Sequence, residues 1–382
     1  VTGASQDEAM AEVARATPPV AEADADSDTF PLAPIQHALW VGRNDDQQLG
    51  GVAAHLYIEL DGQGVDPARL QSAAAALAAR HPMLRVDILP DGTQRISDRG
   101  LPVTVYDLRD RVLADAEVRL EEIRDEKSHQ IMHGEVLQIS LSLLPDGRTR
   151  LHVDLDMQAA DAVSYRNFMS DLAEFYSGGT LPDLGYTYRE YRAALTEAVS
   201  ETEEDRRWWA ERVPTLPEGP ALPLVPRSEQ ADPRRGTRRV HIFDVATRDA
   251  LFAAAHRRGI TPAMAVAASY AGTLARWSTN RRFLLNLPMF GREQFHPDVD
   301  RLVGDFTSSL MLDVDLTGAD TPVSRARVLQ ETLHATARHS SYSGLSVLRD
   351  LTRHHGTPVL APIVYPSALG LGDLFAGKVT EY

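Results

Sequence analysis

The sequence contains no cysteine among its 382 residues. This absence excludes disulfide bonds, thiolate metal sites and a cysteine nucleophile, and it favours a protein of the reducing cytoplasm. The chain also lacks any run of about eighteen apolar residues, the length that a membrane-spanning helix needs. Its first residues show no basic stretch followed by an apolar one, as a secretory signal would. We therefore expect a cytoplasmic protein without a membrane partner.

Concentrated positive charge is absent as well. The formal net charge is −15, and the short arginine pairs are diluted by acidic residues. A nucleic-acid binder needs a basic surface, so we expect no nucleic-acid partner. The sequence has no phosphate-binding P-loop, no dinucleotide fingerprint and no Gly-x-Ser-x-Gly nucleophile elbow. The commonest sequence signatures of nucleotide-dependent enzymes and serine hydrolases are thus missing.

What is present is typical of a globular protein with more than one core. Hydrophobic residues make up 43% and charged residues 24% of the chain, and its length favours two lobes. Residues 1–28 hold no large aromatic residue and are predicted to be a flexible linker. Clustered prolines predict an inter-lobe linker at 214–236. The expected N-terminal lobe is 29–213, and the expected C-terminal lobe, 237–382, lacks a closing element and is expected to be incomplete.

Strands and helices are mixed along both expected lobes, which predicts an α/β (α+β) fold. Alternating apolar residues predict strands at 54–60, 83–89, 94–97, 103–106, 136–144, 149–157, 239–243, 283–288, 309–314 and 359–364. Helical spacing of apolar residues predicts helices at 67–80, 114–129, 164–176, 246–258, 261–277, 322–337 and 344–354.

Acidic residues gather at the end of one predicted strand. Strand alternation places His152, Asp154 and Asp156 on one face, and Asp161 and Ser164 follow shortly after. Polar side chains on a core strand are costly unless they face a cleft or find partners. Three interpretations stay open. Asp156 and Asp161 form an acid/base or positioning pair, or they join Asp154 in a divalent-metal site, or the carboxylates cap the next helix and pair with arginines.

Two other polar positions are less distinctive on local pattern alone. Asp305 lies in a Gly-Asp-Phe-Thr-Ser run before a predicted strand, where an ordinary turn with an aspartate cap is the simpler interpretation. Ser367 follows a predicted apolar strand, where a small polar residue usually begins a loop.

Read in order, several segments resemble the motifs of heterocyclization domains of nonribosomal peptide synthetases, a branch of the condensation-domain superfamily. The resemblance covers about Phe30 to Tyr382. The Asp-x4-Asp-x2-Ser run stands where ordinary condensation domains carry His-His-x3-Asp-Gly. The matching segments are 30–43, 80–95, 156–164, 285–292, 296–299, 304–308, 342–349 and 363–370.

The resemblance implies a fold and an activity. The fold is two chloramphenicol-acetyltransferase-like lobes that form a V around a central tunnel. Upstream and downstream peptidyl carrier proteins insert phosphopantetheine arms from opposite ends, and an adenylation domain lies adjacent. A carrier-bound acyl or peptidyl thioester is condensed with the amine of carrier-bound Ser, Thr or Cys. Cyclodehydration then gives an oxazoline or thiazoline. Neither step requires a bound cofactor or a metal.

The resemblance also implies roles for single residues. Asp161 is expected to pair with Arg292 and hold the fold together, with Ser164 and Asp305 as further site-organising residues. Asp156 is expected nearer the tunnel. Asn286 and Ser367 match polar positions linked with cyclodehydration, so Asp156, Asn286 and Ser367 are the candidate catalytic residues.

Three departures from the family pattern bear on ring closure. Pro366 stands where the family has a threonine that takes part in cyclodehydration, and Pro288 and Gly291 replace a threonine and an asparagine. The family's catalytic aspartate lies beyond the equivalent of Tyr382. Two alternatives therefore remain: condensation without ring closure, or a non-catalytic domain that docks carrier proteins. The sequence does not identify the acyl donor, the acceptor or the ring heteroatom.

Overall fold

The protein forms two compact units built from interleaved parts of the chain. The computed structural model describes residues 28–43, 53–132, 134–198, 202–230, 237–369 and 379. Among the described residues, unit 1 comprises 202–289 and 308–369, and unit 2 comprises 28–198, Phe290–Thr307 and 379. This division differs from the expected lobes, because 202–213 belongs to unit 1 and 290–307 to unit 2. The predicted linker 1–28 lies, except for its last residue, outside the described residues.

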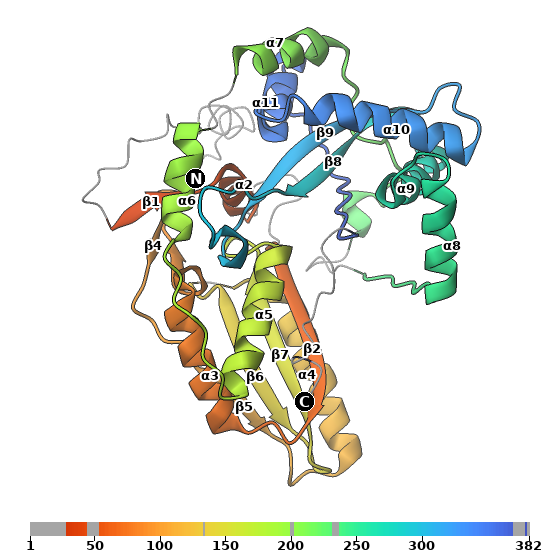
Figure 1. Ribbon diagram of the computed structural model, residues 1–382. Coiled ribbons are helices and arrows are strands. Elements are labelled where there is room, and N and C mark those ends of the chain that lie inside the picture. The colour runs from red at the N-terminus through yellow and green to blue at the C-terminus, as the bar shows by residue number, and fades with distance from the viewer. Residues whose placement is uncertain are drawn as a thin grey trace, which may run out of the picture. The chain divides into compact units, whose positions relative to one another are not determined.

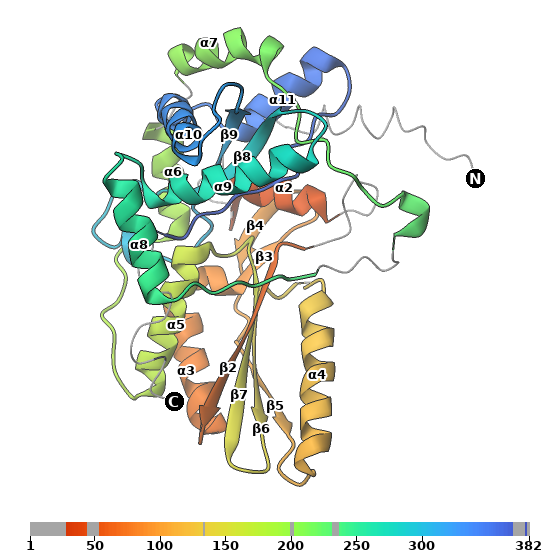
Figure 2. The same ribbon diagram turned by 90° about the vertical axis from the view of Figure 1, so that its right-hand side faces the viewer.

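Unit 2 is built on a four-stranded sheet in the order β2-β7-β6-β5. All neighbours are antiparallel except β5 and β6, which are parallel. Helices α3 and α5 cover one face of this sheet, and α4 covers the other (Figures 1 and 2). The bounds are β2 His55–Gln63, β5 Val103–Asp107, β6 Leu137–Leu143, β7 Arg148–Asp156, α3 Pro67–Arg80, α4 Leu113–His129 and α5 Ala162–Tyr176.

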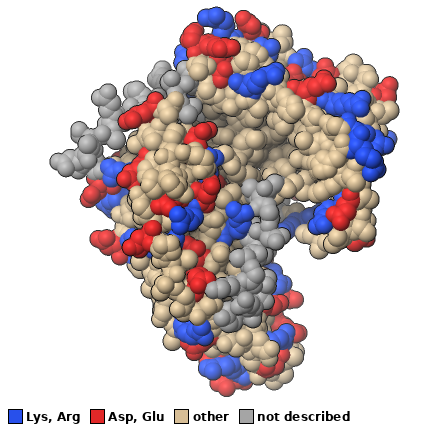
Figure 3. Space-filling view, viewed as in Figure 1, with Lys and Arg blue, Asp and Glu red and all other residues tan. Residues whose placement is uncertain are grey.

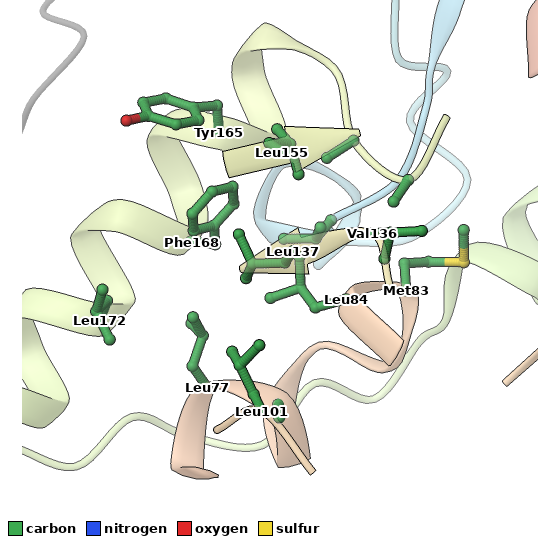
Figure 4. Packing of buried hydrophobic residues seen from close by; sticks show 14 of the residues in the cluster. Leu77, Met83, Leu84, Leu101, Val136, Leu137, Leu155, Tyr165, Phe168 and Leu172 are labelled. Atoms are coloured by element: carbon green, nitrogen blue, oxygen red, sulfur yellow. The ribbon is translucent and has the colours of Figure 1, made fainter. Parts of the chain in front are cut away.

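The core of unit 2 lies between this sheet and helices α3 and α5 (Figure 4). Leu77 of α3 and Phe168 of α5 pack toward Leu137 and Leu155 of the sheet, and all four are buried. Full burial of each such side chain contributes about 1.5–3 kcal/mol. Because side chains alternate along a strand, the neighbours of Leu155 in β7 must point to the face that α4 covers. The acidic residues of β7 are therefore placed under α4.

A smaller sheet and four short elements complete the described part of unit 2. Strands β1, β4 and β3 pair in that order, all antiparallel. The predicted strand 83–89 is wrong in its first half, because a 3₁₀ turn that begins at Pro82 precedes the short strand β3. The bounds are β1 Thr29–Pro31, α2 Pro34–Gly42, η1 Pro82–Arg85, β3 Val86–Ile88, β4 Thr93–Ile96, α6 Tyr188–Ala198 and η4 Val299–Arg301.

Unit 1 is built around the pair of strands β8 and β9, with a hydrophobic cluster on each face. Leu285 and Leu312 face the cluster that includes α9 and α10. Leu284 and Met311 face the cluster that includes Trp209 of α7. The bounds are α7 Glu203–Arg212, η2 Val213–Thr215, η3 Arg227–Glu229, α8 Val245–His256, α9 Pro262–Trp277, β8 Arg282–Phe290, β9 Thr307–Asp315, α10 Pro322–Ala337 and α11 Gly344–His355.

Two strands predicted for unit 1 do not form. Residues 239–243 have no strand partner among the described residues, and their side chains are exposed. Residues 359–364 make only an isolated parallel bridge, between Asn286 and Val364. Part of the proline-rich segment 214–236 lies along β8, because the Leu284 amide donates to the Glu218 carbonyl at 2.9 Å. That part of the segment packs within unit 1.

The surface carries mixed charge. On the face shown in Figure 3, acidic and basic side chains are interspersed within each unit. None of the helices in the described part of the chain is long and apolar enough to cross a membrane.

Candidate functional site

Asp156 ends strand β7 and is a paired, buried carboxylate. Arg43, at the C-terminal end of α2, donates a short hydrogen bond to its Oδ2. The Gln158 amide donates to Oδ1 at 3.0 Å. Arg43 also donates to the Met132 carbonyl at 3.2 Å, which fixes the guanidinium from a second side. Asp156 therefore does not stand as a free general base.

Asp154 and His152 lie under α4 and have partners of their own. Lys127 of α4 donates to Asp154 Oδ2 at 2.7 Å, and Gln130 donates to Oδ1 at 2.7 Å. His152 lies 2.7 Å from the Tyr57 hydroxyl and is buried. Burial lowers the pKa of His152 to about 4, so its imidazole is neutral near pH 7. These contacts give the buried polar side chains on this face of β7 hydrogen-bond partners within the protein.

Asp161 begins helix α5 and forms the pair predicted for it. Its Oδ1 accepts from the Ser164 amide at 2.7 Å, as an N-cap does, and from Arg292 at 3.1 Å. Arg292 also donates to Ser164 Oγ at 2.9 Å and lies 3.9 Å over the Phe306 ring. The Asp161–Arg292 ion pair thus ties segment 290–307 to α5 within unit 2.

Ser164 and Gly304 form the second part of this junction. Ser164 Oγ donates to the Gly304 carbonyl at 2.8 Å, and the Asp161 amide donates to the same carbonyl at 3.0 Å. Gly304 is required here, because a Cβ would stand 2.2 Å from the Tyr188 ring. The backbone of segment 290–307 approaches α5 and α6 too closely for any side chain at this position.

Asp305 is the most perturbed acid of the site. Its carboxylate is buried, with Oδ1 accepting from the Thr307 amide at 3.0 Å. Its Oδ2 has no hydrogen-bond partner within the described part of the chain. Burial, and to a smaller extent the charge of Asp161, raises the pKa of Asp305 to about 7. The local pattern suggested an ordinary turn, and the structure adds a carboxyl group that titrates near neutrality.

The acidic residues do not gather around one point. Asp154, Asp156 and Asp161 are held by Lys127, Arg43 and Arg292 respectively. No group of three or more His, Asp or Glu side chains suited to a metal ion occurs among the described residues. Asp161 caps helix α5 and pairs with an arginine, whereas Asp154 and Asp156 pair with Lys127 and Arg43 without capping a helix.

The other two candidate catalytic residues belong to unit 1. Asn286 of β8 exchanges backbone hydrogen bonds with Ile363 and Tyr365, and its Oδ1 accepts from Ser309 Oγ at 2.8 Å. Ser367 follows two residues after Tyr365 and is half-buried. The structure therefore groups Asp161, Ser164, Arg292 and Asp305 in unit 2 and places Asn286 and Ser367 in unit 1.

Sequence reasoning missed two of the basic residues at this site. The sequence places Arg43 only within the matching segment 30–43, and it gives no signal for Lys127. Each lies far from its partner in the chain, 113 residues for Arg43 and 27 for Lys127. Local spacing therefore gives no reason to pair Arg43 with Asp156 or Lys127 with Asp154.

Comparisons with known proteins agree with this architecture. The sequence model of the condensation domain matches residues 26–367. Phenyloxazoline synthase MbtB of Mycobacterium sp. (strain MCS) is 75% identical over 92% of the chain, which covers 30% of that protein. The protein of the same name from Mycobacterium tuberculosis is 60% identical over 97% of the chain, which covers 27% of it. The chain thus spans less than a third of the length of these curated relatives.

A solved structure is also similar. The cyclization-docking bidomain of the nonribosomal peptide synthetase EpoB from Sorangium cellulosum superposes with a TM-score of 0.78 at 32% identity. The match covers 90% of this chain and 71% of that one. The chain therefore belongs to the condensation-domain family and, within it, to the heterocyclization domains of nonribosomal peptide synthetases.

Proposed function

We propose that this domain condenses a carrier-bound acyl thioester with the amine of carrier-bound Ser or Thr and then forms an oxazoline. The observation that carries this proposal is the 75% identity, over 92% of the chain, to a protein named phenyloxazoline synthase. An oxazoline ring requires a side-chain hydroxyl, which favours Ser or Thr over Cys. The phenyl group in that name favours an aromatic acyl donor.

The chemistry has two steps with different needs. The amine nitrogen attacks the thioester carbon and the carrier thiol leaves, which depends mainly on holding the two substrates together. The hydroxyl oxygen then attacks the new amide carbon, and the amide oxygen leaves as water. This second step removes one proton from the hydroxyl and one from the amide nitrogen, which forms the C=N bond of the ring, and it supplies two protons to the departing oxygen.

The partners follow from the same proposal. Upstream and downstream peptidyl carrier proteins deliver both substrates on phosphopantetheine, and an adenylation domain loads the downstream carrier. The chain itself holds no cofactor in this scheme, and the reaction takes place in the cytoplasm.

The geometry supports distinct roles for the candidate residues. Asp161, Arg292, Ser164 and Asp305 organise the site. Asp156 is proposed to lie nearer the chemistry, where the Arg43 guanidinium holds its carboxylate in place. Asn286 and Ser367 are proposed to assist ring closure.

The test is an assay with the intact protein and two loaded carrier proteins, read by mass spectrometry. We expect an amide product that has lost one further water, and we expect Asn286→Ala and Ser367→Ala to slow that loss. An amide without water loss would support the alternative of condensation alone, which Pro366 favours because it carries no hydroxyl. Carrier binding without any amide would support a docking domain.

A further inference from the structure

Three buried glutamines join distant parts of unit 2 beside Asp156. They are Gln36 of α2, Gln94 of β4 and Gln158 in the turn after β7, and all three are fully buried. We call this group the glutamine clamp. It includes none of the candidate catalytic residues, so the scheme above leaves it without a role.

Gln36 is the centre of the clamp, and its amide is fully used. Its Nε2 donates to the Gln158 carbonyl at 2.5 Å and to Gln94 Oε1 at 3.2 Å. Its Oε1 accepts from the Ala33 amide at 2.8 Å and from Gln94 Nε2 at 3.0 Å. A flipped amide would set donor against donor at Ala33, so only one orientation satisfies these bonds. The glutamine clamp therefore holds the Gln36 amide in a single orientation.

The glutamine clamp is connected to Asp156 in two ways. Gln158 Nε2 donates to the Gln36 carbonyl at 3.0 Å, while the Gln158 backbone amide donates to Asp156. Helix α2 carries Gln36 in its first turn and ends at Gly42, next to Arg43, the cation that holds Asp156. The helix is therefore fastened at one end by the clamp and at the other by the ion pair.

The length of α2 makes this fastening important. A helix of nine residues is too short to be stable alone, so its position depends on tertiary contacts. A rotation by one residue turns a helix through about 100°, which would carry the Arg43 guanidinium away from Asp156.

We propose that Gln36, Gln94 and Gln158 are positioning residues. They hold α2 in place so that the Arg43 guanidinium stays paired with the Asp156 carboxylate during the reaction. The inference rests on the proposed function, because it assumes that Asp156 takes part in amide or ring formation. It adds three residues that act through Arg43 and Asp156 without touching the substrate.

The test compares Gln36→Met with a control at an exposed glutamine of the same unit, Gln71→Met. Gln71 also bridges backbone groups in unit 2, accepting from the Val103 amide and donating to the Leu101 carbonyl, but it has no contact with the clamp. Methionine keeps the length of the side chain and removes its hydrogen bonds. Both variants are assayed at temperatures where each is folded, for amide formation and for water loss.

We expect Gln36→Met to lower kcat by about tenfold more than Gln71→Met, with KM for the carriers unchanged. In an Asp156→Asn background, the further loss from Gln36→Met should shrink to less than about twofold, since coupled residues are not additive. If Gln36→Met does not fold, Gln94→Met, which leaves the Gln36–Gln158 bonds in place, is assayed in the same two backgrounds.

The outcomes separate the two hypotheses. A wild-type protein that forms no amide overturns the proposed function itself. An active wild type whose Gln36→Met or Gln94→Met variant behaves like Gln71→Met, or loses the same factor with and without Asp156, overturns the inference.

Discussion

At the scale of single residues, Asp161 carries two structural tasks at once. It caps α5 and holds the buried guanidinium of Arg292. We predict that Asp161→Ala destabilises the protein by about 3–5 kcal/mol, because it leaves a buried charge without its partner and removes a helix cap. Activity should fall as well.

Urea unfolding of Asp161→Ala, beside the exposed control Asp98→Ala, measures this effect. An unfolding midpoint equal to that of the wild type, with activity lost, would assign Asp161 to chemistry instead of structure.

Asp305 provides a pH-dependent contribution to stability. Its pKa is about 7 in the folded protein, against an ordinary value of 3.8, because burial disfavours the charged form. Between these values the folded protein binds a proton that the unfolded chain releases. The free energy of unfolding should therefore fall as the pH rises from about 4 to about 7, and the stabilisation is lost above the folded pKa.

Replacing Asp305 with Asn removes the charge and keeps the oxygen that accepts from Thr307. We predict that Asp305→Asn is more stable than the wild type above pH 7, by a few kcal/mol at most, and equal to it near pH 4. Thermal melts across this pH range measure the difference. If the melting temperatures of the two proteins change with pH in parallel, Asp305 is ionised in the folded state throughout this range.

At the scale of elements, α4 is attached to the sheet in two different ways. Its N-terminal half contributes Ala116 and Leu120 to a small apolar cluster. Its C-terminal half contributes Lys127, which pairs with the fully buried Asp154. Removing one partner of such a pair costs far more than removing both.

We predict that Lys127→Met costs about 3 kcal/mol or more, and that Lys127→Met with Asp154→Asn recovers much of this loss. The Asp154→Asn substitution leaves an uncharged side chain that keeps an oxygen for Gln130, so no buried charge remains. A double-mutant cycle by urea unfolding measures the coupling. If the stability losses of the two single variants add up to the loss of the double variant, the two residues are not coupled. That result would place the Lys127–Asp154 pair in surroundings of high dielectric constant.

The sequence predicted elements best where local signals mark both ends. Helices α3 and α10 begin and end at the predicted residues, since each has a proline in the first turn and a side-chain cap. Helices α2, α6 and α7 were not predicted. Helix α7 buries only Asp205 and Trp209, so it has no apolar stripe to recognise.

Strands were harder to predict because a strand needs a neighbour. Residues 239–243 have the expected alternation, yet no described residue pairs with them. The site shows the same limit. Residues Asp161 and Arg292 are separated by 131 positions, and only the family resemblance suggested that they meet. Local spacing cannot select Arg43 or Lys127 from 39 basic residues.

At the scale of the whole molecule, each hydrophobic cluster of the described residues lies within one of the two units. Segment 290–307 leaves β8, packs in unit 2 through Arg292 and Phe306, and returns to β9 in unit 1. Asn286 lies in the same unit as Ser309 and Gly344, where a Cβ on Gly344 would stand 2.7 Å from Ser309 Oγ. Each unit thus contains a residue whose substitution should destabilise that unit, Asp161 in unit 2 and Gly344 in unit 1.

This arrangement predicts that the two units differ in their free energies of unfolding. Proteins with separate cores commonly unfold in more than one transition. We expect calorimetry to show two, with Asp161→Ala lowering only the transition of unit 2 and Gly344→Ala only that of unit 1. Gly100→Ala, where an added Cβ meets nothing within 4 Å, is the control. One transition that both variants lower equally would mean that the crossing segment 290–307 couples the units into a single cooperative fold.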